Sequence, residues 1–102
     1  MSKSLLRTDK EIAEIYERHS KTVYRVCFAY MKNPMDTEDA VQETFIRLIS
    51  KNPRLESEEH EKAWLIRTAT NICKDELKHW WRKHENIDDH LELQEERTIN
   101  TD

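Results

Sequence analysis

A group of basic, aromatic and amide side chains between residues 67 and 83 could bind nucleic acid. Basic groups bind phosphates, aromatic rings stack on unpaired bases, and an amide can hydrogen-bond to the edge of a base. All three kinds of side chain occur in this segment, at Arg67, Asn71, Lys74, Lys78, Trp80, Trp81, Arg82 and Lys83. A second interpretation stays open, in which one tryptophan packs into the core and the cations simply face solvent.

The sequence contains no pattern that is typical of an enzyme. It has no glycine, which excludes a glycine-rich phosphate-binding loop. His79 and His84 are five residues apart, a spacing that does not place both on one helix face. A helix start fully explains the nearest cluster of carboxylates, since acids stabilise that end of a helix: Asp36, Glu38 and Asp39. We therefore expect neither enzymatic activity nor a bound cofactor.

The two cysteines, Cys27 and Cys73, are far apart in sequence and both fall on apolar helical positions. This pattern predicts buried, reduced thiols. A disulfide, or a zinc site that adds a histidine, is a minor alternative. The N-terminus has no long apolar run, so neither secretion nor membrane insertion is indicated, and we expect a cytoplasmic protein.

The charges of the chain are unevenly distributed. Residues 85–102 contain seven acidic residues against Arg97 alone, for a net charge of −6, whereas the whole chain carries −4. Residues 1–84 therefore carry +2. We interpret residues 85–102 as a flexible, solvated acidic tail that follows a more basic folded part.

Composition and periodicity predict an all-α fold, a small bundle of three helices. Glycine is absent and only 36% of residues are hydrophobic, which argues against a sheet protein with tight hairpins. The first helix begins with a capping box at Thr8-Asp9-Lys10-Glu11 and stops at Asn33-Pro34. The second runs from Asp36 to about Ser50, and the third from Ser57 to about Lys83.

Apolar side chains at steps of three and four residues predict the buried face of each helix. In the second helix, Met35 is expected to pack on Ala40, four residues into the helix. Its inward face is expected to comprise Val41, Phe45 and Leu48 with Ile49 or Thr44. The first helix has one long stripe: Ile12, Ile15, Tyr16, His19, Val23, Val26, Cys27 and Tyr30. The stripe of the third helix is wider than one face, so some of its large side chains should be exposed.

The segment from Asp36 to Leu48, DTEDAVQETFIRL, resembles the signature of the second conserved region of bacterial sigma factors, in particular the extracytoplasmic-function group. The segment from Ala63 to Asn71, AWLIRTATN, followed by Asp75 and Leu77, is similar to the promoter-reading helix of that group. Ile15–His19 and Val23–Arg25 resemble its first helix. The resemblance covers about residues 9–84, in the same order and spacing.

The resemblance implies two binding surfaces. The second helix would dock on the clamp coiled coil of the largest subunit of RNA polymerase through its outward residues Asp39, Gln42, Glu43, Ile46 and Arg47. The loop 51–56 and Asn71 would capture a base flipped from the single-stranded −10 element of promoter DNA. The other expected DNA-binding residues lie in this loop and on the third helix: Lys51, Asn52, Arg54, Arg67, Lys74, Lys78 and Arg82. In the family, Trp64 would sit beneath that loop in the core.

The resemblance also implies a domain organisation. Residues 1–8 would be a flexible N-terminus, 9–84 the region 2 domain, and 85–102 the start of a linker toward a region 4 that the sequence lacks. Partners would be core RNA polymerase, promoter DNA and an anti-sigma factor. The chain departs from the family at His79, Trp80 and Trp81, where arginines are common. The segment Lys51–His60 is also unusually acidic, because it contains Glu56, Glu58 and Glu59. Two alternatives remain: a helical protein-interaction module that does not read DNA, and a major-groove binder of duplex DNA.

Overall fold

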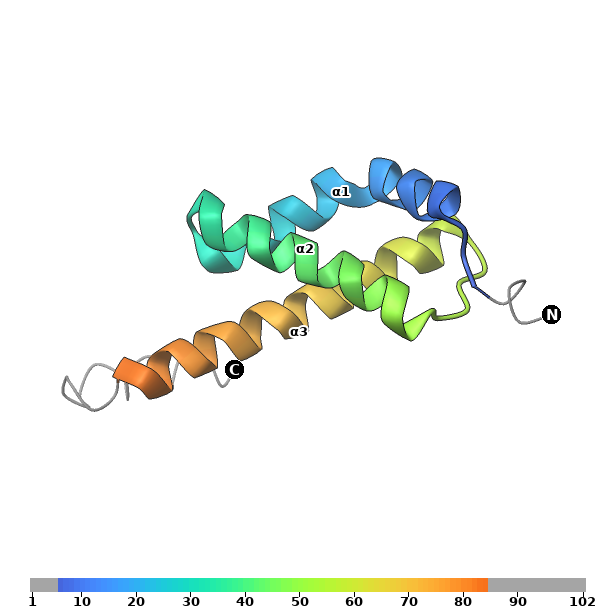
Figure 1. Ribbon diagram of the computed structural model, residues 1–102. Coiled ribbons are helices and arrows are strands. Elements are labelled where there is room, and N and C mark those ends of the chain that lie inside the picture. The colour runs from blue at the N-terminus through green and yellow to red at the C-terminus, as the bar shows by residue number, and fades with distance from the viewer. Residues whose placement is uncertain (1–5, 85–102) are drawn as a thin grey trace.

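The computed structural model describes residues 6–84, which form three helices joined by two short connections (Figure 1). Helix α1 spans Asp9–Met31, α2 spans Pro34–Lys51 and α3 spans Glu58–His84. No strand occurs within residues 6–84, so the prediction of an all-α bundle of three helices is confirmed. The predicted acidic tail, 85–102, and residues 1–5 lie outside the described residues.

Helix α1 begins where the sequence predicts and ends at Met31, two residues before the predicted stop at Asn33. The backbone N–H of Thr8 donates to Oε1 of Glu11 over 2.9 Å, and the backbone N–H of Glu11 donates to Oγ1 of Thr8 over 3.1 Å. These two bonds form the predicted capping box, which satisfies two backbone donors at the helix start. Lys32 then takes a left-handed conformation with φ 64° and ends the helix.

The start of α2 corrects the sequence prediction by two residues. The side-chain oxygen of Asn33 accepts the backbone N–H of Asp36 over 2.8 Å, so Asn33 caps the helix and Pro34 is its first residue. Proline is favoured there because its missing N–H would have no helical partner and its fixed φ suits a helix. Met35 consequently lies within the first turn, and its side chain is 72% exposed rather than buried.

The core lies where the three helices meet, and its most deeply buried side chains include Val23 of α1, Leu48 of α2 and Leu65 of α3. The inward face of α2 is confirmed at Val41, Phe45 and Leu48, with the fourth position taken by Thr44 rather than Ile49. Thr44 can be buried because its hydroxyl donates to the carbonyl oxygen of Ala40 over 2.8 Å. Ile49 is 56% exposed.

Cys27 of α1 and Cys73 of α3 are both fully buried and reduced, as predicted. Hydrogen bonding to Cys27 and burial away from water raise the pKa of the Cys73 thiol. Both cysteines therefore act as core side chains that join α1 to α3. Within residues 6–84, no group of three or more histidine, cysteine, aspartate or glutamate side chains is placed to hold a metal ion.

Helix α3 extends well past the other two helices. Its C-terminal part, orange in Figure 1, projects away from α1 and α2. Accordingly, most residues from 74 to 84 are exposed, and Trp80 is 51% exposed, which agrees with the prediction that some large side chains of this helix face solvent. Among residues 6–84, no helix combines the length and the apolar character that crossing a bilayer requires.

Candidate protein and nucleic-acid interfaces

The structure places the five predicted polymerase-contacting residues on one surface. They line a hollow of about 610 Å³ between α2 and α3: Asp39, Gln42, Glu43, Ile46 and Arg47. The α3 side of the same hollow is formed by residues to which the sequence analysis gave no role at this surface, namely Ile72, Asp75, Glu76 and His79. We call this surface the α2/α3 groove. The contribution of the four α3 residues to this groove could not be predicted from the sequence, because it depends on how α3 crosses α2.

The α2/α3 groove is acidic. Nε of Arg47 lies 3.3 Å from Oε2 of Glu43, one turn earlier on α2. The other three carboxylates of the groove, those of Asp39, Asp75 and Glu76, form no ion pair with any residue in the range 6–84. Ile46 is 52% exposed in the middle of these polar groups. Such a surface suits a partner that presents basic side chains around one apolar contact.

Four basic side chains and one amide form a row along α3, which we call the α3 stripe. Its members, spaced by four, three, four and four residues, all lie on one helix face and are all exposed: Arg67, Asn71, Lys74, Lys78 and Arg82. From first to last they span about 22 Å at 1.5 Å per residue. The buried side chains of α3, including Leu65 and Ala69, lie on the opposite face. The α3 stripe is therefore available to a negatively charged partner.

Aromatic side chains occur at both ends of α3 but in different surroundings. The Trp80 ring stacks on the His84 ring, with centroids 4.0 Å apart and planes inclined by 22°. Trp81 is partly buried. Trp64, in contrast, packs against the core near the start of the helix, as expected. Of the three tryptophans, Trp80 is thus the one with a largely open surface.

The predicted DNA-binding residues near the loop lie at the other end of the molecule from Trp80. Lys51 is the last residue of α2, Asn52 caps that helix with φ 44°, and Arg54 is exposed in the connection that follows. A hollow of about 640 Å³ separates this connection from α1, and its lining includes Asn52, Pro53, Arg54 and Leu55. Asn71, which is exposed on α3, is not among the residues that line this hollow.

Comparison with known proteins assigns the fold to a family. Residues 15–84 match the family model described as Sigma-70 region 2. The chain belongs to the Sigma-70 region 2 family. This region 2 domain is 30% identical over 73 residues to a protein named ECF RNA polymerase sigma factor SigX from Bacillus subtilis, an alignment that covers 72% of this chain and 36% of the relative.

Other relatives carry similar names. SigW from Bacillus subtilis is 29% identical over 66 residues, which cover 65% of this chain and 35% of that protein. SigE from Mycolicibacterium smegmatis is 36% identical over 62 residues, which cover 61% of this chain and 24% of that protein. Both are named as ECF RNA polymerase sigma factors. The chain spans about a third or less of the length of these relatives. No solved structure matches it significantly.

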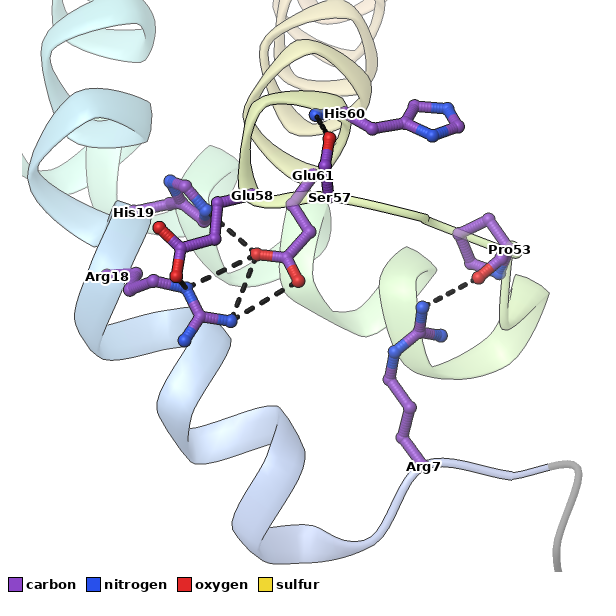
Figure 2. A network of polar contacts seen from close by, with 8 residues as sticks. All are labelled: Arg7, Arg18, His19, Pro53, Ser57, Glu58, His60 and Glu61. Atoms are coloured by element: carbon purple, nitrogen blue, oxygen red, sulfur yellow. Dashed lines mark hydrogen bonds and ion pairs between the residues drawn. The ribbon is translucent and has the colours of Figure 1, made fainter.

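The region 2 domain also contains a polar network that the sequence analysis did not anticipate (Figure 2). Glu61, in the first turn of α3, accepts hydrogen bonds from Arg18 and lies 3.0 Å from Nε2 of His19, both on α1. Arg7, just before α1, donates to the start of the loop, at Asn52 and Pro53. A polar His19 in the apolar stripe of α1 was the one signal in the sequence that pointed to a buried polar partner.

Proposed function

We propose that this chain is the promoter-recognition domain of an alternative sigma factor of the extracytoplasmic-function group. It docks on the clamp coiled coil of RNA polymerase and captures the non-template strand of the melted −10 element, so that transcription can begin. The observation that carries the proposal is the separation of two surfaces. The acidic α2/α3 groove holds all five expected polymerase contacts, while the α3 stripe faces solvent on a different side of α3.

Docking in the α2/α3 groove is supported by its charge and shape. The carboxylates of Asp39, Asp75 and Glu76 can each pair with a basic side chain of the partner helices, which gives orientation and a fast encounter. Burial of Ile46 in the complex would supply apolar contact at the centre of the interface. Helix α3 would thus contribute to polymerase binding as well as to DNA binding.

The α3 stripe and the loop would act on DNA that is already opening. Base-pair stacking is worth about 1.4 kcal/mol per step, so opening four steps costs about 6 kcal/mol. Two captured bases return about 2–6 kcal/mol by stacking, and the captured strand loses conformational freedom. The domain therefore traps bases after the polymerase has positioned and strained the duplex, and does not melt DNA alone.

The test is fluorescence anisotropy of the full chain with labelled single-stranded oligonucleotides that differ in the −10 region, and with a duplex control. We expect one group of single strands to bind best and the Asn71→Ala variant to lose part of that preference. Lys21→Ala, which changes an exposed residue of α1, serves as the control and should retain it. Equal affinity for all sequences, unaltered by Asn71→Ala, would contradict base capture.

A second candidate is a protein-interaction module that binds polymerase or an anti-sigma factor without reading DNA. It is favoured by exposed apolar side chains on α1 and α2, with exposures of 41–56%: Tyr16, Phe28, Ile46 and Ile49. Several of these side chains line a hollow of about 500 Å³ between the two helices. Retained polymerase binding with no preference among single strands would select this candidate.

A further inference from the structure

The connection between α2 and α3, residues 52–57, is held at its start by a side chain from outside the helices. Nη1 of Arg7 donates to Oδ1 of Asn52 over 2.9 Å. Nη2 of Arg7 donates to the carbonyl oxygen of Pro53 over 2.7 Å, the contact that Figure 2 shows. Both acceptors are neutral, and Arg7 forms no ion pair with any residue from 6 to 84. The contact therefore depends on the two-pronged geometry of the guanidinium group.

The main chain at Arg7 is itself fixed. The next residue, Thr8, is tied to Glu11 by the two hydrogen bonds of the capping box. The guanidinium group of Arg7 therefore reaches the loop from a backbone anchored to the first turn of α1. A side chain on an anchored backbone loses less conformational entropy when it binds, so its hydrogen bonds can hold the loop more effectively.

The end of the same connection is fixed to α1 as well. Ser57 caps α3 by accepting the backbone N–H of His60 over 3.0 Å. One turn later, Glu61 is bound by Arg18 and His19 of α1. Between these two attachments, Leu55 packs on the core, whereas Arg54 faces solvent. The connection is thus held at both ends: at its start by Arg7, just before α1, and just after its end by Arg18 and His19 of α1.

From this geometry we propose that Arg7 is a positioning residue for base selection. Arg7 sets the conformation of the connection 52–57, and so determines which base this loop accepts, without itself touching DNA. The proposal rests on the proposed function, because the loop must be a base-binding element for its conformation to affect selectivity. Arg7→Lys separates positioning from charge, since lysine retains the charge but cannot make both hydrogen bonds with the same geometry.

The experiment has two measurements on the full chain, made for wild type, Arg7→Ala, Arg7→Lys and the control Arg25→Ala, an exposed arginine of α1. The first is hydrogen–deuterium exchange of the loop without DNA. We expect both Arg7 variants to exchange about fivefold to thirtyfold faster in residues 52–57, as loss of two hydrogen bonds implies. Exchange in the core of α3 and in Arg25→Ala should match wild type.

The second measurement is the ratio of affinities for the preferred single-stranded −10 oligonucleotide and for versions with one base replaced. The ratio should fall in Arg7→Ala and in Arg7→Lys, but not in Arg25→Ala. Unchanged loop exchange, an unchanged ratio, or full rescue by Arg7→Lys would each overturn the role of Arg7. If wild type itself shows no base preference, the proposed function fails, and the role of Arg7 in selectivity fails with it. Failure of the proposed function is therefore seen in wild type, whereas failure of the Arg7 proposal alone is seen only in the Arg7 variants.

Discussion

The carboxylate of Glu61, in the first turn of α3, lies 3.0 Å from Nε2 of His19, on α1, and the two side chains are only 13% and 8% exposed. The same carboxylate accepts hydrogen bonds from Arg18 over 3.0 and 3.2 Å. A carboxylate this well buried is costly unless it is paired. The pairing therefore fixes the start of α3 against α1, and with it one end of the loop that we assign to base capture.

Loss of the Glu61 carboxylate should destabilise the domain. In Glu61→Gln the amide retains the shape of the side chain but not its charge, and the buried ring of His19 and the partly exposed guanidinium group of Arg18 lose a charged partner. We expect the free energy of unfolding to fall by about 1–3 kcal/mol in urea denaturation. Hydrogen bonding to Glu61 also raises the pKa of Arg18, which agrees with a favourable interaction between the two.

Glu58→Gln is the matched control for this variant. Glu58 also faces Arg18, at 3.7 Å, but its side chain is 70% exposed. Exposed ion pairs contribute little to stability, so the free energy of unfolding should change by less than about 0.5 kcal/mol. Equal effects of the two substitutions would show that burial of Glu61 does not matter.

The buried thiols should be protected from chemical modification. Thiolates, and not thiols, react with disulfide reagents such as dithionitrobenzoate. Both Cys27 and Cys73 are shielded from solvent, and the pKa of Cys73 is raised. We expect no appreciable reaction of either thiol in the folded chain and complete reaction in denaturant. Fast labelling under native conditions would show that the contact between α1 and α3 opens readily.

The raised pKa of Cys73 also predicts a loss of stability in alkali. The unfolded thiol releases its proton near pH ~8.5, whereas the folded thiol keeps it to higher pH. Above that value the unfolded state binds fewer protons, so rising pH favours unfolding. The free energy of unfolding should therefore decrease between pH ~7 and pH ~9.5. Cys73→Ala should show a smaller decrease, and an unchanged decrease would contradict this assignment.

The α3 stripe predicts how DNA binding depends on salt. Each phosphate contact with a single strand contributes about 0.7 to the slope of log K against log salt. Replacing Lys74 and Lys78 together with alanine should therefore reduce that slope by about 1.4. The exposed pair Lys10 and Lys21 of α1, replaced in the same way, should leave it unaltered. An equal reduction of the slope for both lysine pairs would show that DNA is attracted by the overall charge of the domain and not by the α3 stripe.

The helices themselves were largely predictable because their signals are local. The capping box at Thr8 and the stripe that contains Val23 and Cys27 depend only on spacing along the chain. The start of α2 was misplaced because both Asn33 and Asp36 are good caps, and the proline between them favours the earlier one. Met35 then lies inside the helix, where its side chain is largely exposed.

The candidate sites were predictable only in part, because they depend on contacts between helices. The outward residues of α2 could be named from periodicity and resemblance, whereas Asp75 and Glu76 join them only through the way α3 crosses α2. The same holds for Arg7, whose hydrogen bonds to Asn52 and Pro53 connect residues about 45 positions apart in sequence. Contacts between residues so far apart in the chain cannot be predicted from local sequence spacing.

The central claim is that one chain binds polymerase through the α2/α3 groove and a DNA strand through a different surface. The most direct measurement is the affinity of the labelled chain for core RNA polymerase and, separately, for the preferred single strand. Ile46→Asp adds a charge to the groove, whereas Ile49→Asp adds the same charge to an equally exposed isoleucine of α2 outside it.

We predict that Ile46→Asp weakens polymerase binding by about tenfold or more, the loss expected for a central interface residue, and leaves single-strand binding intact. Asn71→Ala should show the reverse pattern, and Ile49→Asp should resemble wild type in polymerase binding. If Ile46→Asp bound polymerase as tightly as wild type, or if Ile46→Asp and Asn71→Ala each weakened both interactions equally, the two-surface account would be contradicted.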